Sequence, residues 1–496
     1  PLSAHGKIDR RALEELADTG PSSRQLPRGP AEAAVAGVWR EVLGVDEVSR
    51  DDNFFALGGN SLLALQVRAR LTRATGSELP VETFFEASRL SDLARRLEAE
   101  DTGSAQPVPA PADTEPASDD RLSYAQLRLW FQHQLDPHDR SYNIIEGLTL
   151  EGPADVETLD LACREVVERH EALRTMIELG PAGPIRRVRA RTSELGGHGA
   201  VDVRQVDDDG RAELLDVLSR PFDLAQEAVR FGIVRHGADG AELYVSAHHA
   251  VSDGTGVECI LEDIGRIYSS LVAGEELPPP KTPDAAPYSA HVARQRALVE
   301  SGRLDGRIDA LVERLRGRCS PVSLPSGRAA ADDPGRVDTH LSVEQDAVLR
   351  RSASHQGTTV PVMVLTALQI VVSRWSGHDD FAVGVPLVGR SGTRFERTVG
   401  MFVNALPVPS VTGDAGTARQ AVQLTRERLV GALADQDVPF ETLLERLEPE
   451  RDPSRPPLFQ IMFNQLDMSI DARFEGLSVT PMPPLATGAK YDLTLY

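Results

Sequence analysis

The sequence predicts a multidomain chain in which a small all-α bundle precedes a larger α/β domain. Residues 31–97 show helical periodicity without strand patterns, an acidic and proline-rich stretch occupies 101–120, and strand and helix patterns alternate from Arg121 onward. The length of 496 residues also exceeds the roughly 150 residues of one typical domain. We therefore expect two folded units joined by a linker.

The composition is that of a soluble globular enzyme, with 41% hydrophobic and 26% charged residues. The formal net charge of −22 disfavours nucleic acid or an anionic membrane as a partner, because lysine and arginine draw proteins to both. No secretory signal opens the chain, and apolar runs such as 360–372 fall short of the roughly 20 residues that span a bilayer. We expect a cytoplasmic protein.

Cysteine is too rare and too scattered for a disulfide framework or a cysteine-rich zinc site. The chain has three cysteines: Cys163, Cys259 and Cys319. We expect them to be buried thiols in a reducing compartment.

Residues 1–27 predict no folded domain of their own. Residues 1–13 form a polar turn and a short basic segment that is too small to fold alone. The glycines and prolines that follow are typical of a linker.

Residues 28–100 carry the patterns of a small helical bundle. Apolar residues line one face of a helix that ends near Gly44. A second apolar helix runs over about 61–71, and residues 81–97 supply the remainder of the bundle.

Ser61 is predicted to stand exposed at the start of the second of these helices. Gly58 and Gly59 let the preceding loop turn tightly. Unsatisfied N–H groups and the positive end of the helix dipole favour an anion attached there. The alternative is that Ser61 only caps the helix. A hydrolase nucleophile is disfavoured, because Leu63 replaces the second glycine of G-x-S-x-G.

The stretch 101–120 predicts a mobile, extended tether. It holds four prolines, five acidic residues and no basic residue, so it lacks the apolar surface for a core. Such a tether suits a domain that must visit several active sites, and like charges keep it extended.

A histidine pair lies where a predicted strand meets a predicted helix. Apolar and other side chains alternate over 243–248, which predicts a half-buried strand and places His249 with its apolar face. Apolar residues recur at helical spacing over 257–271, so 252–256 is predicted to be the connecting turn.

The chemistry of this pair suits a general base. Histidine has an unperturbed pKa of about 6.5, so at a strand end it is able to take a proton from an amine or hydroxyl. The alternative is two satisfied structural histidines. A metal site at His248, His249 and Asp253 is disfavoured, because neighbours on a strand diverge and no third ligand is evident nearby. We predict no metal site.

Three segments resemble parts of nonribosomal peptide synthetases. The pattern His-His-x-x-x-Asp-Gly at 248–254 resembles the signature of the condensation-domain superfamily, which shares the chloramphenicol acetyltransferase fold. Asp-Asn-Phe-Phe-x-Leu-Gly-Gly-Asn-Ser-Leu at 52–62 is similar to a peptidyl carrier protein, which implies a four-helix bundle over about 28–100. Residues 1–13 resemble the last motif of an adenylation domain, with Lys7 at the position of its lysine.

Further stretches resemble condensation motifs in family order, namely 122–130, 169–175, 399–404, 436–441 and 451–460. The resemblance implies two similar lobes, over about 121–285 and 286–496, with the histidine motif in a tunnel between them. The chain stops within an apparent strand at Tyr496, so the second lobe is expected to be incomplete.

The resemblance implies amide bond formation. A phosphopantetheinyl transferase would attach phosphopantetheine to Ser61, and the donor thioester there would meet an aminoacyl amine on a downstream carrier. An upstream adenylation domain of the same synthetase would be a further partner. His249 would bind or deprotonate the amine, and His248 and Gly254 would complete the catalytic motif, with His248 facing the other way and ordering the strand.

The family pattern also implies a structural ion pair and a tunnel residue. Asp253 would pair with Arg169, or with Arg174 as the second candidate, and Asn404 would hydrogen-bond within the tunnel. Residues 288–294 lack the aspartate and final tryptophan of the corresponding motif, and Gly256 stands where serine is common. Pro409 likewise departs from the arginine that usually follows the asparagine motif. These departures affect substrate preference and the detail of the tunnel.

Three other functions compete with condensation. An epimerisation domain shares the histidine signature but not the motifs at 122–130, 402–404 and 451–460. A heterocyclisation domain would carry aspartates in place of the histidines. A non-catalytic platform that recruits a partner enzyme is disfavoured by the intact His249 and Asp253.

Overall fold

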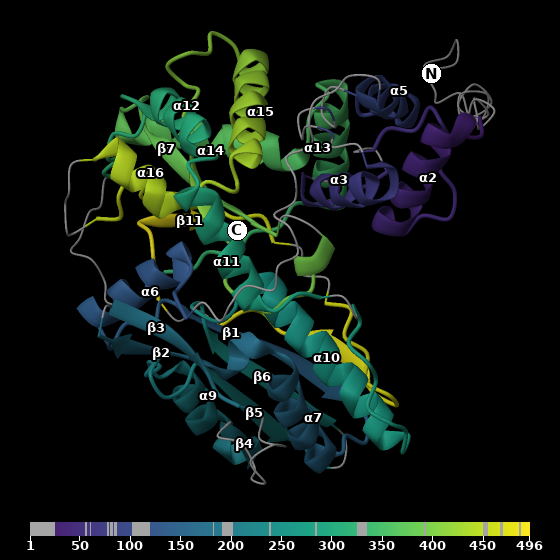
Figure 1. The fold of residues 1–496 in the computed structure, drawn as a ribbon, viewed down its shortest axis with the longest axis vertical. Helices are drawn as coiled ribbons and strands as arrows, with labels where there is room; N and C mark the ends of the chain where they lie inside the picture. The colour runs from purple at the N-terminus through teal and green to yellow at the C-terminus, as the bar shows by residue number, and fades with distance from the viewer. Residues whose placement is uncertain are drawn as a thin grey trace, which may run out of the picture. The chain divides into compact units, whose positions relative to one another are not determined.

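The computed structural model divides into two compact units, Pro1–Ala110 and Pro111–Tyr496, and each is described by itself (Figure 1). The structure describes residues 25–101 with gaps at 55–56, 60, 77–78, 80–82 and 84–86. It also describes residues 120–496, with gaps at 182, 191–201, 238–239, 283–284, 325–334, 391–392, 450–454, 467–469 and 486–487. Lys7, the 101–120 tether except for its two end residues, and the start of the 451–460 motif therefore lie outside the described residues.

The long regular elements described in the first unit are helices. Its helices are α2 (Gly29–Leu43), α3 (Ser61–Thr75) and α5 (Leu90–Asp101). They bury one apolar core in which the rings of Trp39 and Phe54 lie 5.2 Å apart. The α2 helix ends at Gly44, whose φ of 64° is the left-handed conformation that glycine adopts without strain.

The second unit contains a five-stranded sheet, called the first sheet here, with strand order β10-β1-β6-β5-β4. Its strands are β1 (Asn143–Glu151), β4 (Asp202–Asp207), β5 (Val229–Arg235), β6 (Gly240–His248) and β10 (Ser478–Pro481). The helices near it are α7 (Val156–Arg169), α9 (Arg211–Ser219) and α10 (Gly254–Val272), and a hairpin is formed by β2 (Thr175–Gly180) and β3 (Gly183–Val188). Strand β10 comes from near the end of the chain and pairs with β1, so the C-terminal part of the chain returns to the first sheet.

A second, four-stranded sheet has the order β11-β9-β7-β8. Its strands are β7 (Ala382–Leu387), β8 (Asn404–Pro409), β9 (Ile461–Phe463) and β11 (Leu493–Leu495). The remaining α-helices of this unit are α6 (Tyr124–Leu135), α11 (Tyr288–Glu300), α12 (Asp305–Leu315), α13 (Val343–His355), α14 (Val360–Ser376), α15 (Ala418–Ala434) and α16 (Phe440–Leu447). Both helices and strands contribute to the unit, although in its described residues five helices, α10 to α14, follow one another between β6 and β7 (Figure 1).

Strand β6 is buried on both faces, so the prediction of a half-buried strand is wrong. The side chains of Leu243, Val245 and Ala247 belong to the main core of the unit. On the other face Tyr244 packs with α9 residues in a second apolar cluster, and Ser246 is fully buried. The reason is topological, because β6 is the middle strand of the first sheet and helices cover both of its sides.

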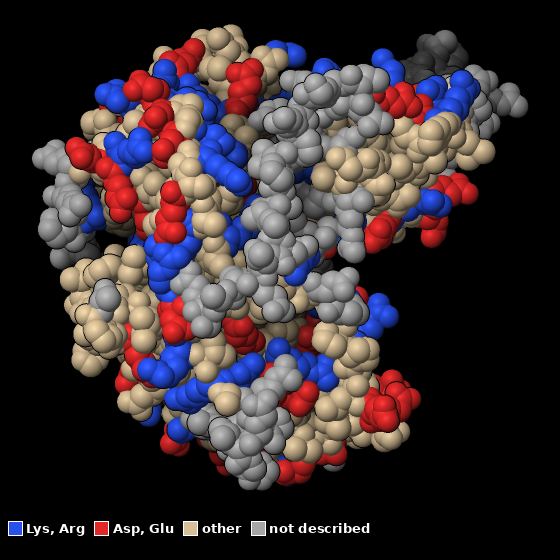
Figure 2. Space-filling model, in the orientation of Figure 1, with Lys and Arg blue, Asp and Glu red and all other residues tan. Residues whose placement is uncertain are grey.

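Within the described part of the chain, no single helix is long and apolar enough to cross a membrane. Helices α13 and α14 meet the length and composition test only when taken together, across a bend of 97°. Acidic and basic side chains are interspersed over the face of the second unit seen in Figure 2.

Candidate active site

The turn after β6 presents the histidine pair and is held by neighbouring elements. His248 is the last residue of β6 and lies opposite Asn143 on β1. The His249 amide continues this pairing by donating to the Tyr142 carbonyl at 2.8 Å. The Gln126 amide group, in the 122–130 motif, donates to the Ala250 carbonyl at 2.9 Å. The loop conformation is thus fixed by β1 and by α6.

His248 is buried and serves the turn. The Ala250 amide donates to His248 Nδ1 at 3.1 Å, so the neutral ring carries its proton on Nε2. Its ring lies among those of Phe222, His133 and Tyr142, with centroids 6.2 to 6.4 Å away. Burial lowers the pKa of His248 to about 3, so the imidazole stays neutral. This environment is that of a structural histidine.

His249 differs from His248 because its side chain is partly exposed. Its Nδ1 is buried and accepts no hydrogen bond within the described residues. Burial holds the pKa of His249 well below its usual range, and the charge of Lys490 lowers it further. The imidazole is therefore neutral at pH 7, and one of its two ring nitrogens carries a lone pair that is able to take a proton. A low pKa also makes it a weak base, which limits the rate gain it is able to supply.

Asp253 forms a buried, bidentate ion pair with Arg390. The two Nη–Oδ distances are both 2.8 Å, and the side chains are 0% and 4% exposed. The carboxylate also accepts from the Gly256 amide at 2.8 Å, which caps α10, and from the Phe402 amide at 3.1 Å. The Arg390 guanidinium carbon lies 4.4 Å from the centroid of the Phe402 ring. Asp253 therefore joins the turn of the first sheet to the chain that follows β7 of the second.

The prediction that Asp253 pairs with Arg169 or Arg174 is wrong. Arg169 instead pairs with Glu165 one turn earlier on α7, at 3.0 Å. Arg174 donates to the Arg189 carbonyl. The sequence does indicate the observed partner of Arg169. Glu165 lies four residues before it, and a Glu–Arg pair at this spacing on a helix is favourable.

The two glycines of the turn have different surroundings. A Cβ added to Gly254 would meet nothing within 4 Å, so it leaves open space at the first residue of α10. A Cβ at Gly256 would lie 2.5 Å from Ser252 Oγ. A serine at position 256 would therefore require the side chain of Ser252 to shift.

Asn404, for which we predicted a hydrogen bond within the tunnel, makes its hydrogen bonds to backbone groups of residues 436–440. Its amide nitrogen donates to the carbonyls of Gln436 and Val438 at 3.0 and 2.6 Å. Its oxygen accepts from the Phe440 amide at 3.1 Å. All three partners belong to the segment that leads into α16, so Asn404 shapes the 436–441 motif.

Ser61 begins α3, a helix of 15 residues. Gly58 before it has a φ of 98°, and a Cβ at Gly59 would lie 2.4 Å from the Phe54 ring. Both glycines are therefore required by the turn, as predicted. Backbone N–H groups at the start of a helix of this length suit a phosphodiester attached to Ser61.

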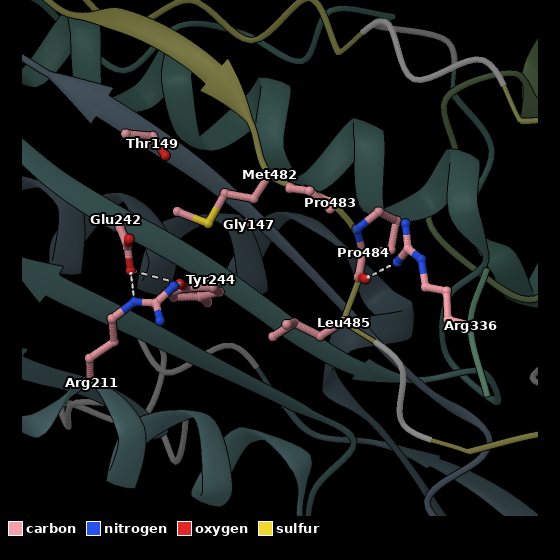
Figure 3. Close-up of a pocket in the computed structure, with 10 residues that line it drawn as sticks. All are labelled: Gly147, Thr149, Arg211, Glu242, Tyr244, Arg336, Met482, Pro483, Pro484 and Leu485. Carbon is pink, nitrogen blue, oxygen red and sulfur yellow. Dashed lines mark hydrogen bonds and ion pairs between the residues drawn. The ribbon is translucent and has the colours of Figure 1, made fainter. Parts of the chain in front are cut away.

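A pocket of about 500 Å³ lies away from the histidine turn (Figure 3). Glu242 and Tyr244 line it from the face of β6 that also carries His248. Arg211 is already paired there, with Glu242 at 2.6 Å and the Tyr244 hydroxyl at 2.8 Å. The segment 482–485 covers the opposite wall. The charges of Arg211 and Glu242 are thus paired with each other, and Arg336, which also lines the pocket, pairs with Asp338 at 2.9 Å.

Glu146 lies on β1 opposite Val245, on the sheet face that Tyr142 and Ile144 share. Its side chain is partly exposed, and no ion pair or hydrogen bond involves its carboxyl within the described residues. Burial raises the pKa of Glu146 from 4.5 to about 7. Between pH 4.5 and about pH 7 the Glu146 carboxyl is protonated in the folded protein but ionised in the unfolded chain. The free energy of unfolding therefore falls as the pH rises through this window.

We expect Glu146→Gln to abolish this penalty, because glutamine cannot ionise. Relative to wild type, the variant should gain up to about 3 kcal/mol of unfolding free energy between about pH 5 and pH 8. Urea denaturation at both pH values measures the gain. A difference between variant and wild type that stays constant with pH would contradict this assignment.

Comparison with family models finds two matches along the chain. The model described as "Condensation domain" matches residues 118–496, and the model described as "Phosphopantetheine attachment site" matches residues 33–97. Together they include the histidine turn and Ser61.

The relatives are large synthetases of which this chain spans a small part. Tyrocidine synthase 3 of Brevibacillus parabrevis is 32% identical to it, malpinin synthetase of Mortierella alpina is 30% identical, and surfactin synthase subunit 1 of Bacillus subtilis is 29% identical. All of this chain is covered in each case, but only 8%, 6% and 14% of the relative.

Solved structures with the same fold include the first condensation domain of the calcium-dependent antibiotic synthetase, at a TM-score of 0.63 and 24% identity over 75% of this chain and 86% of that one. The X-domain from teicoplanin biosynthesis matches at a TM-score of 0.66 and 22% identity, over 76% and 85% of the two chains.

Proposed function

The chain belongs to the condensation-domain family of nonribosomal peptide synthetases and carries a phosphopantetheine attachment domain ahead of the condensation domain, and from that premise we propose that it forms amide bonds. The donor is an acyl thioester on its own carrier, and the acceptor is an aminoacyl amine on a downstream carrier. The observation that carries the proposal is the neutral, partly exposed imidazole of His249 in a turn fixed by the Asp253–Arg390 pair.

The proposed step follows from the state of His249. The acceptor amine attacks the donor carbonyl, and the new C–N bond leaves a positive charge on nitrogen and a negative charge on oxygen. His249 takes a proton from that nitrogen, the carbonyl re-forms, and the C–S bond breaks. General-base help is worth roughly 10² to 10⁴ in rate, whereas fixing two reactants removes about 7 to 11 kcal/mol of barrier. Positioning of the two thioesters is therefore the larger contribution.

The same proposal assigns the architecture and partners in more detail. The first unit is a four-helix carrier, and the two sheets of the second unit form two chloramphenicol-acetyltransferase-like lobes. An upstream adenylation domain, of which residues 1–13 are the tail, and a phosphopantetheinyl transferase complete the partners. The cytoplasm is the setting we propose, and it suits the three free thiols, two of which are buried.

The start of α3 leads us to expect that Ser61 carries the phosphopantetheine arm. Phosphopantetheine supplies the thiol that holds the acyl group as a thioester. Incubation with coenzyme A and a phosphopantetheinyl transferase should add the mass of one arm to wild type and none to Ser61→Ala. A matched control, Ser91→Ala on α5, should accept the arm as wild type does. Equal labelling of Ser61→Ala and wild type would remove the carrier assignment.

The experiment that tests the proposed function identifies the product bond and its stereochemistry. A donor loaded on Ser61 is mixed with a loaded acceptor carrier, and the thioesters are then cleaved and analysed by chiral chromatography. A condensation domain gives an amide. An epimerisation domain gives the racemised donor without an amide, and a recruiting domain returns both amino acids unchanged. Either of the latter results would overturn the proposal.

A further inference from the structure

Lysine is rare in this chain, and one lysine lies beside the histidine turn. Of the 53 lysine and arginine residues only Lys7, Lys281 and Lys490 are lysines, so arginine is the ordinary cation of this sequence. Lys281 lies on the surface and pairs with Glu262 at 2.9 Å. Lys490 has no carboxylate partner within salt-bridge distance among the described residues.

The Lys490 ammonium lies close to the ring that neighbours His249. Its Nζ is 5.0 Å from the centroid of the Tyr142 ring, and that ring is 6.4 Å from the imidazole of His249. The charge of Lys490 is also the largest influence, after burial, that lowers the pKa of His249. Lys490 comes from the chain just before β11, whereas Tyr142 precedes β1, so residues of both sheets meet here.

The backbone that carries Lys490 is fixed on both sides. A Cβ at Gly488 would lie 2.9 Å from Ser141 Cβ, so glycine permits the close approach of this segment to the start of β1. The Asp492 amide donates to the Gln460 carbonyl at 2.9 Å. Gln460 directly precedes β9, so this bond ties the chain after Lys490 to the second sheet. The position of the ammonium is therefore set by the fold.

The groups around Lys490 favour loss of its proton. Burial and the charge of Arg128 lower the pKa of Lys490 to about 8, against a smaller opposing effect of Asp139. Arg128 itself is paired with Glu441 at 2.8 Å. An arginine at position 490 would remain charged, because a guanidinium is not deprotonated in proteins. Lysine in this place therefore supplies a proton donor that arginine does not.

We propose that Lys490 is a further catalytic residue of the condensation, one that protonates the thiolate leaving the donor. The inference rests on the proposed function. As the tetrahedral intermediate collapses, the C–S bond breaks and its electron pair goes to sulfur. The Lys490 ammonium gives that sulfur a proton, and the proton that His249 took from the amine returns to Lys490 through solvent. One amine and one thioester thus become one amide and one thiol.

The chemistry matches the two proton carriers to each other. The leaving group is an alkyl thiolate at least as basic as that of cysteine, whose pKa is about 8.5, so a proton passes to it from the Lys490 ammonium without an uphill step. The Lys490 ammonium has no anionic partner among the described residues, so its charge is able to stabilise the negative charge that develops on the reacting thioester. Such electrostatic stabilisation is strongest where water is excluded.

Two variants separate proton donation from charge alone. Lys490→Met removes both, and Lys490→Arg keeps the charge but not the transferable proton. With diffusible alkyl thioester donors we expect both variants of the full chain to form amide about 10² times more slowly than wild type. With an aryl thioester, whose thiol leaves without a proton, the loss should shrink to a few-fold. The control Lys281→Met should condense at the wild-type rate.

A readout that needs no turnover accompanies these rates. The few lysines allow competitive acetylation, with each site followed by peptide mass spectrometry as the pH is raised. Lys490 should reach half of its maximal reactivity near pH 8, before Lys281 does.

Each outcome decides a separate point. Wild-type rates for Lys490→Arg would overturn proton donation, and wild-type rates for Lys490→Met would remove Lys490 from the reaction. Equal losses with alkyl and aryl thioesters would mark the residue as structural. If wild type forms no amide from any donor and acceptor, the proposed function fails. Competitive acetylation does not depend on turnover, so it would still show whether the Lys490 amine reacts near pH 8.

Discussion

Replacing His249 with alanine is expected to slow single-turnover amide formation by roughly 10² to 10⁴, with both carriers loaded. The physical reason is that His249 is the partly exposed member of the pair, whereas His248 is buried and its Nδ1 accepts from the Ala250 amide. The rate constant is measured by rapid quench and intact mass. Residual activity is expected, because positioning of the reactants does not depend on this side chain.

His248→Ala is the matched control for this experiment. We expect it to lower the free energy of unfolding, since it empties a buried site between Phe222 and Tyr142 and removes the partner of a backbone amide. Its rate must therefore be compared with its melting curve. If His249→Ala condensed at the wild-type rate while a folded His248→Ala did not, the two roles would be exchanged.

Breaking the Asp253–Arg390 pair is expected to destabilise the second unit by about 3 to 5 kcal/mol. Asp253→Ala leaves the Arg390 guanidinium buried without its carboxylate, and it also removes the cap of α10. Urea denaturation followed by tryptophan fluorescence measures the loss. The amide-forming rate should fall as well, because the capped turn holds His249.

Two further variants locate the partner of Asp253. The Asp253→Ala/Arg390→Ala double variant should lose less than the sum of the two single losses, as directly paired charges do. Arg169→Ala should cost less than about 1 kcal/mol, since its partner is Glu165 on the same helix. A strictly additive double variant, or coupling between Asp253 and Arg169, would contradict the pairing described here.

Local patterns predicted the elements of the site but not all of their contacts. The strand, the turn and the helix around His249 follow from side-chain periodicity, and the tight loop before Ser61 follows from two glycines. Periodicity is a property of neighbouring residues, so it was reliable there. The same reasoning predicted a half-buried β6 and was wrong, because the covering of both faces depends on where a strand lies in its sheet.

The misassigned and missed residues depend on long-range packing. Arg390 lies 137 residues after Asp253, and no local pattern joins them. Lys490 and Tyr142 likewise approach each other only because the end of the chain returns to the start of β1. The amide of Asn404 likewise bonds to the backbone of 436–440, and no local pattern indicated these partners. Position 490 was missed, although lysine is rare in this sequence.

The transfer of mass between two carriers tests the central claim most directly. A donor of known mass is loaded on Ser61 of the full chain, a loaded acceptor carrier is added, and both proteins are followed by intact mass spectrometry over time. We expect the donor mass to leave this chain and to appear on the acceptor carrier as an amide, with His249→Ala delaying both changes equally. Retention of the donor on Ser61 in wild type, with the acceptor mass unchanged, would contradict it.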